Sequence, residues 1–185
     1  MLYRVFPLVP NALPDAPGGA LYVARERQGS GRHDHPEHYG ALYVSRSPES
    51  AVAERIQAFR GQIIGDADLR FASGARLALA TFDDETLDPL VDLDDPAELV
   101  ARGLRPSGVA TRDRSATRAI ALGLYEEGHA GFAWWSTLES GWSNVTLFAE
   151  RSSSALALHA APEVLSVAHL VLRRAAEAIG VRLAP

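Results

Sequence analysis

Three imidazoles and two carboxylates are concentrated in six consecutive residues, His33-Asp34-His35-Pro36-Glu37-His38. Imidazole nitrogen and carboxylate oxygen both bind zinc and related divalent ions, so this pattern is typical of a metal site. A metal-dependent hydrolase built on His33, His35 and His38 would need further ligands downstream. His129 and His159 are available, but no suitably placed Asp accompanies them. We therefore expect solvated loop histidines and no bound metal, and keep the hydrolase as a second hypothesis.

A small, permissive turn, Gly29-Ser30-Gly31-Arg32, precedes this cluster. Glycines allow backbone N–H groups to approach a phosphate, and an arginine supplies a charged fork for two of its oxygens. The turn is therefore a candidate anion site, although most glycine-rich turns bind nothing.

A helix is expected to begin at Ser47-Pro48-Glu49, because Ser is a favoured N-cap, Pro fits the first helical position and an acid suits the positive end. We expect it to run over residues 48–59. Its core stripe comprises Val52, Ile56 and Phe59. Glu54 lies roughly 160–200° around the helix from that stripe, at 100° per residue, and so faces solvent or a cleft.

The remaining pattern alternates short apolar runs with turns. It predicts strands at 2–6, 20–24, 41–44, 75–82, 131–135, 144–149 and 155–158, and helices at 96–101, 111–127 and 162–179. Pro7 is expected to end the first strand. Because strands outnumber helices without regular βαβ alternation, we predict an α+β fold: a single domain over residues 1–185, with a largely antiparallel mixed β-sheet core flanked by helices.

The two longer predicted helices have apolar faces that should pack on the core. The packing side of 111–127 comprises Ala116, Ile120, Gly123 and Leu124. The buried face of 162–179 comprises Val164, Val167, Ala168, Val171, Ala175 and Ile179.

Composition excludes several classes of protein. The absence of cysteine excludes disulfides, thiolate nucleophiles and Cys-based zinc sites. With a net charge of −5 and no basic cluster alternating with aromatics, direct nucleic-acid binding is not expected. Apolar runs are too short for a signal peptide or a membrane span, so we expect a cytoplasmic protein that does not bind membranes.

Several segments, taken in order, resemble the RES domain family, which is named for its Arg, Glu and Ser. They are Gly31-Arg32-His33-Asp34, Gly40 to Val44, Ser47 to Glu54, Phe132-Ala133-Trp134-Trp135-Ser136 and Asn144 to Phe148. With the opening Leu2-Tyr3-Arg4-Val5, the resemblance spans residues 2–148. No single motif is specific, but the ordered set is. His33 stands where the family usually has a bulky aromatic, and Trp135 where tyrosine is common.

The resemblance implies an ADP-ribosyltransferase-like fold and an NAD-consuming toxin restrained by an Xre-type helix-turn-helix antitoxin. It implies catalytic roles for Glu54, Arg32 and Tyr43, and NAD binding by Arg32, Tyr43, Ser136 and His33. NAD would be a substrate and not a permanently bound cofactor, with inorganic phosphate as a candidate co-substrate. A homodimer is also expected.

This residue set suits cleavage of the nicotinamide–ribose bond. Nicotinamide leaves as a neutral molecule, so one carboxylate suffices where ordinary glycosidases need two. Glu54 would stabilise charge on the ribose, Tyr43 would stack on the nicotinamide or hydrogen-bond near it, and Arg32 would clamp a phosphate. Ser136 could donate to a phosphate or ribose oxygen. The acceptor stays open between phosphate, water and a protein side chain. A third hypothesis is an inactive RES-like module that acts only through its antitoxin.

Overall fold

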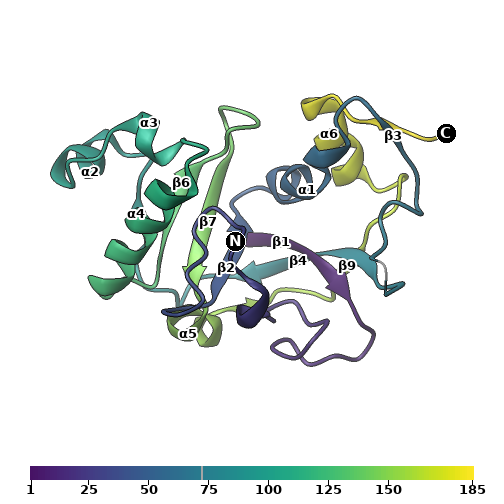
Figure 1. Ribbon diagram of the computed structural model, residues 1–185. Helices are drawn as coiled ribbons and strands as arrows, with labels where there is room; N and C mark the ends of the chain where they lie inside the picture. Colours follow the sequence, from purple (N-terminus) through teal and green to yellow (C-terminus); the bar gives the residue numbers. More distant parts are fainter. Residues whose placement is uncertain (72) are drawn as a thin grey trace.

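The computed structural model describes residues 1–71 and 73–185, in which eight strands form one sheet (Figure 1). The strands of this sheet are β1 (Leu2–Leu8), β2 (Ala41–Ser45), β4 (Arg76–Asp83), β5 (Val91–Asp92), β6 (Gly131–Trp135), β7 (Ser143–Phe148), β8 (Ala157–Leu158) and β9 (Glu163–Val164). Their order is β5-β6-β7-β2-β1-β4-β8, with β9 also paired to β4. All of these pairs except the parallel pair β5–β6 are antiparallel.

Helices flank this sheet, which confirms the predicted α+β fold with a largely antiparallel mixed sheet. They are α1 (Pro48–Ile56), α2 (Pro96–Ala101), α3 (Pro106–Val109), α4 (Arg114–Glu126), α5 (Ala149–Ser152) and α6 (Leu170–Ile179). A separate parallel pair joins β3 (Ile63–Ile64) to β10 (Arg182–Leu183). Among the described residues, none of the helices combines the length and apolar composition needed to cross a bilayer.

The first helix forms as its sequence predicts. Ser47 is the N-cap, and its hydroxyl accepts a hydrogen bond from the Ser50 N–H at 3.1 Å. The helix continues as a 3-10 turn over Gln57–Phe59, so the expected span 48–59 is confirmed. Val52 and Ile56 are fully buried, as the core stripe requires.

Side-chain alternation along the central strands gives the sheet two different faces. Leu42 and Val44 of β2, with Val145 and Leu147 of β7, belong to an apolar cluster on one face. The strand register places Tyr43 opposite Thr146 and Ser45 opposite Asn144 on the other face. The β-sheet period of two thus directs the polar side chains of both strands to a single surface.

Two groups of helices cover that second face (Figure 1). Helices α1 and α6 pack over β1 and β4 around Val52, Leu79 and Leu172. Helix α4 packs over β6 and β7 around Phe132 and Leu124. The polar surface of β2 and β7 therefore lies between two helical layers.

Two strand predictions near the N-terminus are wrong. Residues 20–24, expected to be a strand, form a turn and irregular chain. The carbonyls of Ala20 and Tyr22 accept hydrogen bonds from the guanidinium of Arg4 in β1. These carbonyls therefore bond to a side chain and not to the backbone of a neighbouring strand. Strand β1 also continues through Pro7 to Leu8. It pairs with β2 only at Tyr3, so on that side its distal end is an edge where proline is tolerated.

The C-terminal helix begins at Leu170 and not at Pro162. Residues 163–164 form β9, which pairs with Ala78 and Leu79 of β4, and this pairing prevents a helical start there. Of the predicted buried face, Ala175 and Ile179 are buried, and Val171 is partly buried against the same core. The complete buried set of α6 is Leu172, Ala175, Ala176 and Ile179.

The packing side of α4 is also shifted from the prediction. Its buried residues are Thr117, Ala121 and Leu124, so of the predicted set only Leu124 is fully buried. Thr117 turns inward because its hydroxyl donates to the Arg32 carbonyl at 2.5 Å. The buried stripe of α4 thus includes a polar residue, Thr117, which a search for apolar residues alone does not find.

Candidate active site

A cavity of about 420 Å³ lies over β2 and β7, with walls supplied by α1, α4 and the loop before β2. The predicted site residues Arg32, Tyr43 and Glu54 all line it. Residues that sequence reasoning did not assign to a site also contribute, among them Asn144, Arg114, Arg55 and Trp134. The fold thus brings three predicted residues from a loop, a strand and a helix to one cavity.

The Glu54 carboxylate is half-buried and held on both oxygens. Its Oε1 accepts hydrogen bonds from Asn144 Nδ2 at 2.9 Å and from Ser136 Oγ at 3.3 Å. Its Oε2 accepts from Gln57 Nε2 at 2.8 Å. The position opposite the core stripe of α1 therefore faces a cleft, which was one of the two orientations expected.

Asn144 is a buried amide whose orientation is determined by two hydroxyl groups. Its Oδ1 accepts from Ser45 Oγ at 2.7 Å and from Ser50 Oγ at 2.8 Å. Because hydroxyl donors occupy the oxygen, the amide nitrogen must be the atom that points to Glu54. All three residues are at most 3% exposed. Sequence reasoning gave them no role, and an asparagine among the apolar residues of a strand was the only signal.

The Tyr43 hydroxyl holds the loop that precedes its strand. It donates to Asp34 Oδ1 at 2.7 Å and accepts from the His33 backbone N–H at 2.9 Å. Burial, followed by the neighbouring Asp34 carboxylate, raises the pKa of Tyr43 above its ordinary value. The phenol therefore stays protonated near neutral pH, and its ring is the part left to act in the cavity.

The glycine-rich turn does not form the expected phosphate cradle. The N–H groups of Gly29 and Gly31 both donate to Asp34 Oδ2, at 2.8 and 2.6 Å. An intramolecular carboxylate therefore occupies the donors that a phosphate would use. A Cβ on Gly31 would lie 2.4 Å from Asp34 Oδ1, so this close approach requires glycine.

Arg32 is anchored on one side. Its Nη1 donates to the Thr111 carbonyl at 2.7 Å, and its Cζ lies 5.1 Å from the centroid of the Trp134 ring. Burial, followed by Arg114, lowers the pKa of Arg32, while Glu54 opposes that shift. Arg55 and Arg114 are exposed residues that line the same cavity. This concentration of guanidinium groups favours an anionic ligand, in a protein whose net charge is −5.

His33 and Ser136 are buried residues that contact the side chains lining the cavity. The His33 N–H donates to Tyr43, and the Ser136 hydroxyl donates to Glu54. His33 is 2% exposed, and its Nδ1 lies 2.8 Å from Thr146 Oγ1, which also accepts from Trp134 Nε1 at 3.1 Å. Burial, followed by Arg32, lowers the pKa of His33 well below its ordinary value, so the ring is neutral. Neither His33 nor Ser136 is among the described residues that line the cavity, and their contact with NAD stays a prediction.

The model of the RES domain family matches residues 1–169, most of the chain. This chain belongs to the RES domain family. A chain in the crystal structure of the M. tuberculosis MbcT–MbcA toxin–antitoxin complex is similar to it, with a TM-score of 0.60 and 22% sequence identity. The similarity covers 89% of this chain and 83% of that chain, and it shows a shared fold. Comparison with curated proteins gave no significant match.

The two residues that depart from the family pattern, His33 and Trp135, both lie next to Trp134. His33 contacts the Trp134 ring edge-on, with centroids 5.1 Å apart. Trp135 follows at the end of β6 and is only half-buried. An aromatic plane is kept at both positions, and the buried imidazole adds a polar contact to Thr146 that a purely apolar ring could not make.

The three-histidine cluster does not form as a unit. His33 turns into the protein, whereas His35, Glu37 and His38 form a separate group at the surface. None of these three belongs to the described residues that line the cavity. The ligand set His33, His35 and His38 is therefore wrong, because burial and the Thr146 contact commit His33 elsewhere.

Proposed function

We propose that this RES domain binds NAD in the cavity and cleaves its nicotinamide–ribose bond. The observation that supports this most directly is that one cavity is lined both by Glu54 of α1 and by Arg32 of the loop before β2. NAD has complementary chemistry, since its nicotinamide ribose becomes positively charged as the bond breaks while its pyrophosphate is negative throughout.

Glu54 would act on the ribose. A cation develops at the ribose carbon as neutral nicotinamide departs, and a carboxylate already fixed by Asn144, Ser136 and Gln57 stabilises it without reorganising. A general acid is not needed, because the leaving group carries no negative charge. The single carboxylate is thus sufficient for this reaction, unlike the pair used by ordinary glycosidases.

The guanidinium groups would bind the pyrophosphate, or a phosphate co-substrate. Arg32 presents a planar fork held by the Thr111 carbonyl and Trp134, which suits bidentate recognition of phosphate oxygens. Arg55 and Arg114 add positive charge at exposed positions of the same wall. Tyr43 would contribute its ring to the nicotinamide end, because its hydroxyl is engaged with Asp34.

In the cell, this activity would make the protein the toxin of a toxin–antitoxin pair. Membership of the RES domain family and the similarity to a chain of a toxin–antitoxin complex support that role. The partner would be an Xre-type helix-turn-helix antitoxin. The homodimer and the cytoplasmic location stay predictions.

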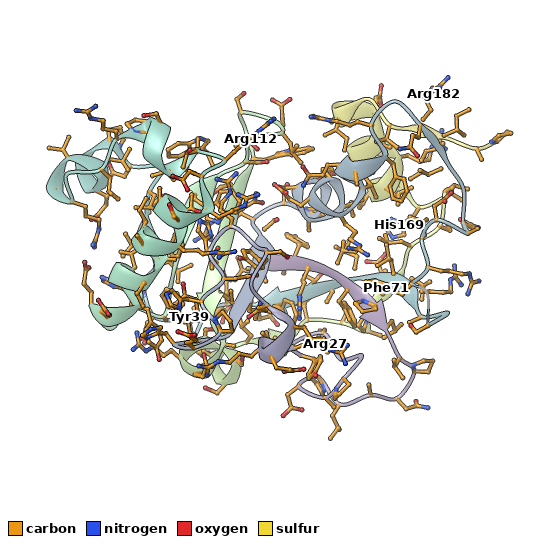
Figure 2. The ribbon with its side chains drawn as sticks, viewed as in Figure 1. Arg27, Tyr39, Phe71, Arg112, His169 and Arg182 are labelled. Atoms are coloured by element: carbon orange, nitrogen blue, oxygen red, sulfur yellow. The ribbon has the colours of Figure 1, made fainter. Side chains whose placement is uncertain are left out.

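The test is incubation of the purified protein with NAD, with and without inorganic phosphate, followed by mass spectrometry of the products. Free nicotinamide is expected when phosphate is present. Release without phosphate as well would identify water or a protein side chain as an acceptor, and the mass of the second product distinguishes these. Arg32→Ala should abolish NAD loss. Arg27→Ala removes the same charge from an exposed side chain outside the cavity and should leave the rate unchanged (Figure 2). Absence of nicotinamide release by the folded wild-type protein would refute the proposal and favour an inactive RES-like module.

A further inference from the structure

Residues 35–39 form a turn that several hydrogen bonds hold in place. The His35 carbonyl accepts from the N–H groups of His38 and Tyr39, at 2.9 and 3.0 Å. The Arg25 Nε donates to the Pro36 carbonyl at 2.5 Å. Tyr39 (Figure 2) closes the turn. It is fully buried, and its hydroxyl donates to the His33 carbonyl at 2.7 Å. The side chains that project from this turn therefore start from fixed positions.

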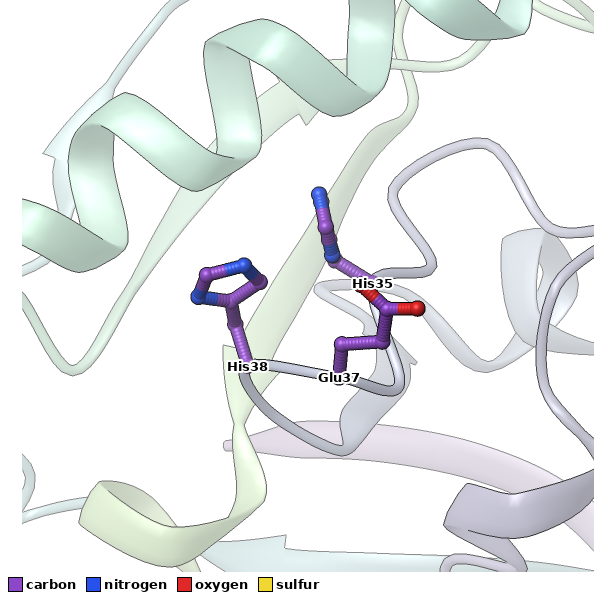
Figure 3. A group of neighbouring side chains, drawn as sticks. All are labelled: His35, Glu37 and His38. Carbon is purple, nitrogen blue, oxygen red and sulfur yellow. The ribbon is translucent and has the colours of Figure 1, made fainter.

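Three of those side chains converge outside the protein core (Figure 3). One ligand atom each from His35, Glu37 and His38 lies within 4.8 Å of the other two. The imidazole rings are perpendicular, with centroids 4.4 Å apart. Within residues 1–71 and 73–185, no hydrogen bond or salt bridge engages these three side chains.

Other surface histidines of this protein are arranged differently. His129 lies 3.1 Å from a Glu127 oxygen, and His159 lies 3.0 Å from an Asp83 oxygen. Each of those imidazoles has a carboxylate partner at hydrogen-bond distance. The turn instead brings together two imidazoles and a carboxylate that have no such contacts among the described residues, so all three groups are available to bind a cation.

We propose that His35, Glu37 and His38 form a binding site for a transition-metal ion of the Zn²⁺ class. Two imidazole nitrogens and one carboxylate oxygen are a ligand set that zinc favours, with water in the fourth position, whereas Mg²⁺ and Ca²⁺ prefer oxygen alone. Ligand atoms around tetrahedral zinc lie about 3.3 Å apart, given bonds of about 2.0 Å. Binding would require the exposed Glu37 and His38 side chains to rotate from their present positions, in which the ligand atoms lie within 4.8 Å of one another.

The ion would clamp the turn and not take part in bond cleavage. The three ligands belong to the same loop as Arg32, but none of them is among the described residues of the cavity wall. A metal that binds only the folded arrangement raises its stability by mass action. The site therefore links metal availability to the stability of the loop that carries Arg32, whether or not NAD is the substrate.

The test is calorimetric titration of tag-free protein with ZnCl₂, together with visible absorption spectra of the Co²⁺ form. One bound ion per chain is expected, with a tetrahedral Co²⁺ spectrum and a higher melting temperature in the presence of Zn²⁺. Loss of an outer-shell partner already weakens metal binding about 10–100-fold, so the double variant His35→Gln/His38→Gln should lose at least as much. Glu37→Gln should weaken binding by about tenfold or more.

His159→Gln is the matched control, because it removes an exposed histidine that stands beside a carboxylate without a third ligand. It should bind Zn²⁺ like the wild type. Melting temperatures measured without metal show whether each variant is folded. Equal affinity in the wild type and a folded double variant, or no saturable binding by the wild type, would overturn the proposal. Chelation with EDTA should leave NAD cleavage unchanged, and its loss would overturn the peripheral role of the ion.

Discussion

Replacement of Glu54 by Gln separates the charge of this side chain from its shape. The Gln oxygen can keep the hydrogen bonds from Asn144 and Ser136, at 2.9 and 3.3 Å in the wild type. The new amide nitrogen meets Gln57, which can rotate its own amide to present oxygen. Glu and Gln also have similar helix propensities. We therefore expect a change in unfolding free energy of no more than about 1 kcal/mol.

The effect on catalysis should be far larger. Removal of one preorganised electrostatic group typically costs about 10²–10³ in rate, or about 2.7–4 kcal/mol of transition-state stabilisation. The measurement is kcat for nicotinamide release by chromatography, beside the melting temperature of the same sample. Glu49→Gln is the control on the same helix. Its carboxylate lies 3.8 Å from Arg174, away from the cavity, so its rate should match the wild type.

Two outcomes would refute this reasoning. If the folded Glu54→Gln protein cleaved NAD at the wild-type rate, the carboxylate charge would have no part in the reaction. If it instead lost several kcal/mol of unfolding free energy, Glu54 would be needed for the fold, and the loss of rate would carry no information about the transition state.

Two further predictions test the surroundings of the carboxylate. Ser45→Ala/Ser50→Ala leaves the buried Asn144 oxygen without donors, at a cost of about 1–3 kcal/mol in unfolding free energy, and frees the amide to turn. We expect kcat to fall about tenfold or more while KM changes less. A rise in KM with unchanged kcat would argue against a positioning role. The pKa of His33 is lowered in the folded state, so the unfolded chain binds the extra proton, and stability falls as pH drops below the unfolded value of about 6.5. His33→Asn should flatten the fall in unfolding free energy between pH 6.5 and the lower pKa of the folded state, whereas the exposed His159→Gln should not; equal pH profiles would show that His33 is not the group responsible.

Much of this fold could be predicted from local sequence. The strands at 41–44, 75–82, 131–135 and 144–149 appear within one residue of their expected ends, because side-chain alternation directly reflects which face is buried. The first helix begins at its predicted N-cap, since capping is a contact between residues close in sequence. Helical periodicity also placed Glu54 opposite the core stripe, and the order of the motifs selected Arg32 and Tyr43.

Elements that depend on distant partners could not be predicted in this way. Residues 163–164 form a strand only because β4 is beside them, and residues 20–24 remain irregular because the Arg4 side chain binds their carbonyls. Thr117 is buried through a bond to the Arg32 carbonyl, 85 residues away in sequence. Each of these contacts joins residues that are far apart in the sequence, so the pattern of neighbouring residues does not predict it.

The candidate active site also has a part that the sequence determines and a part that depends on tertiary contacts. The sequence determined which side chains carry the chemistry, since a carboxylate at position 54 and a guanidinium at position 32 are present whatever the fold. Only the tertiary structure decided what those groups can do. Cross-strand register set Ser45 opposite Asn144, whose amide then directs a hydrogen bond to Glu54, and Asp34 took the glycine N–H groups that a phosphate could have used. Such choices follow from hydrogen-bond partners that meet only when strands and loops far apart in the sequence are packed together.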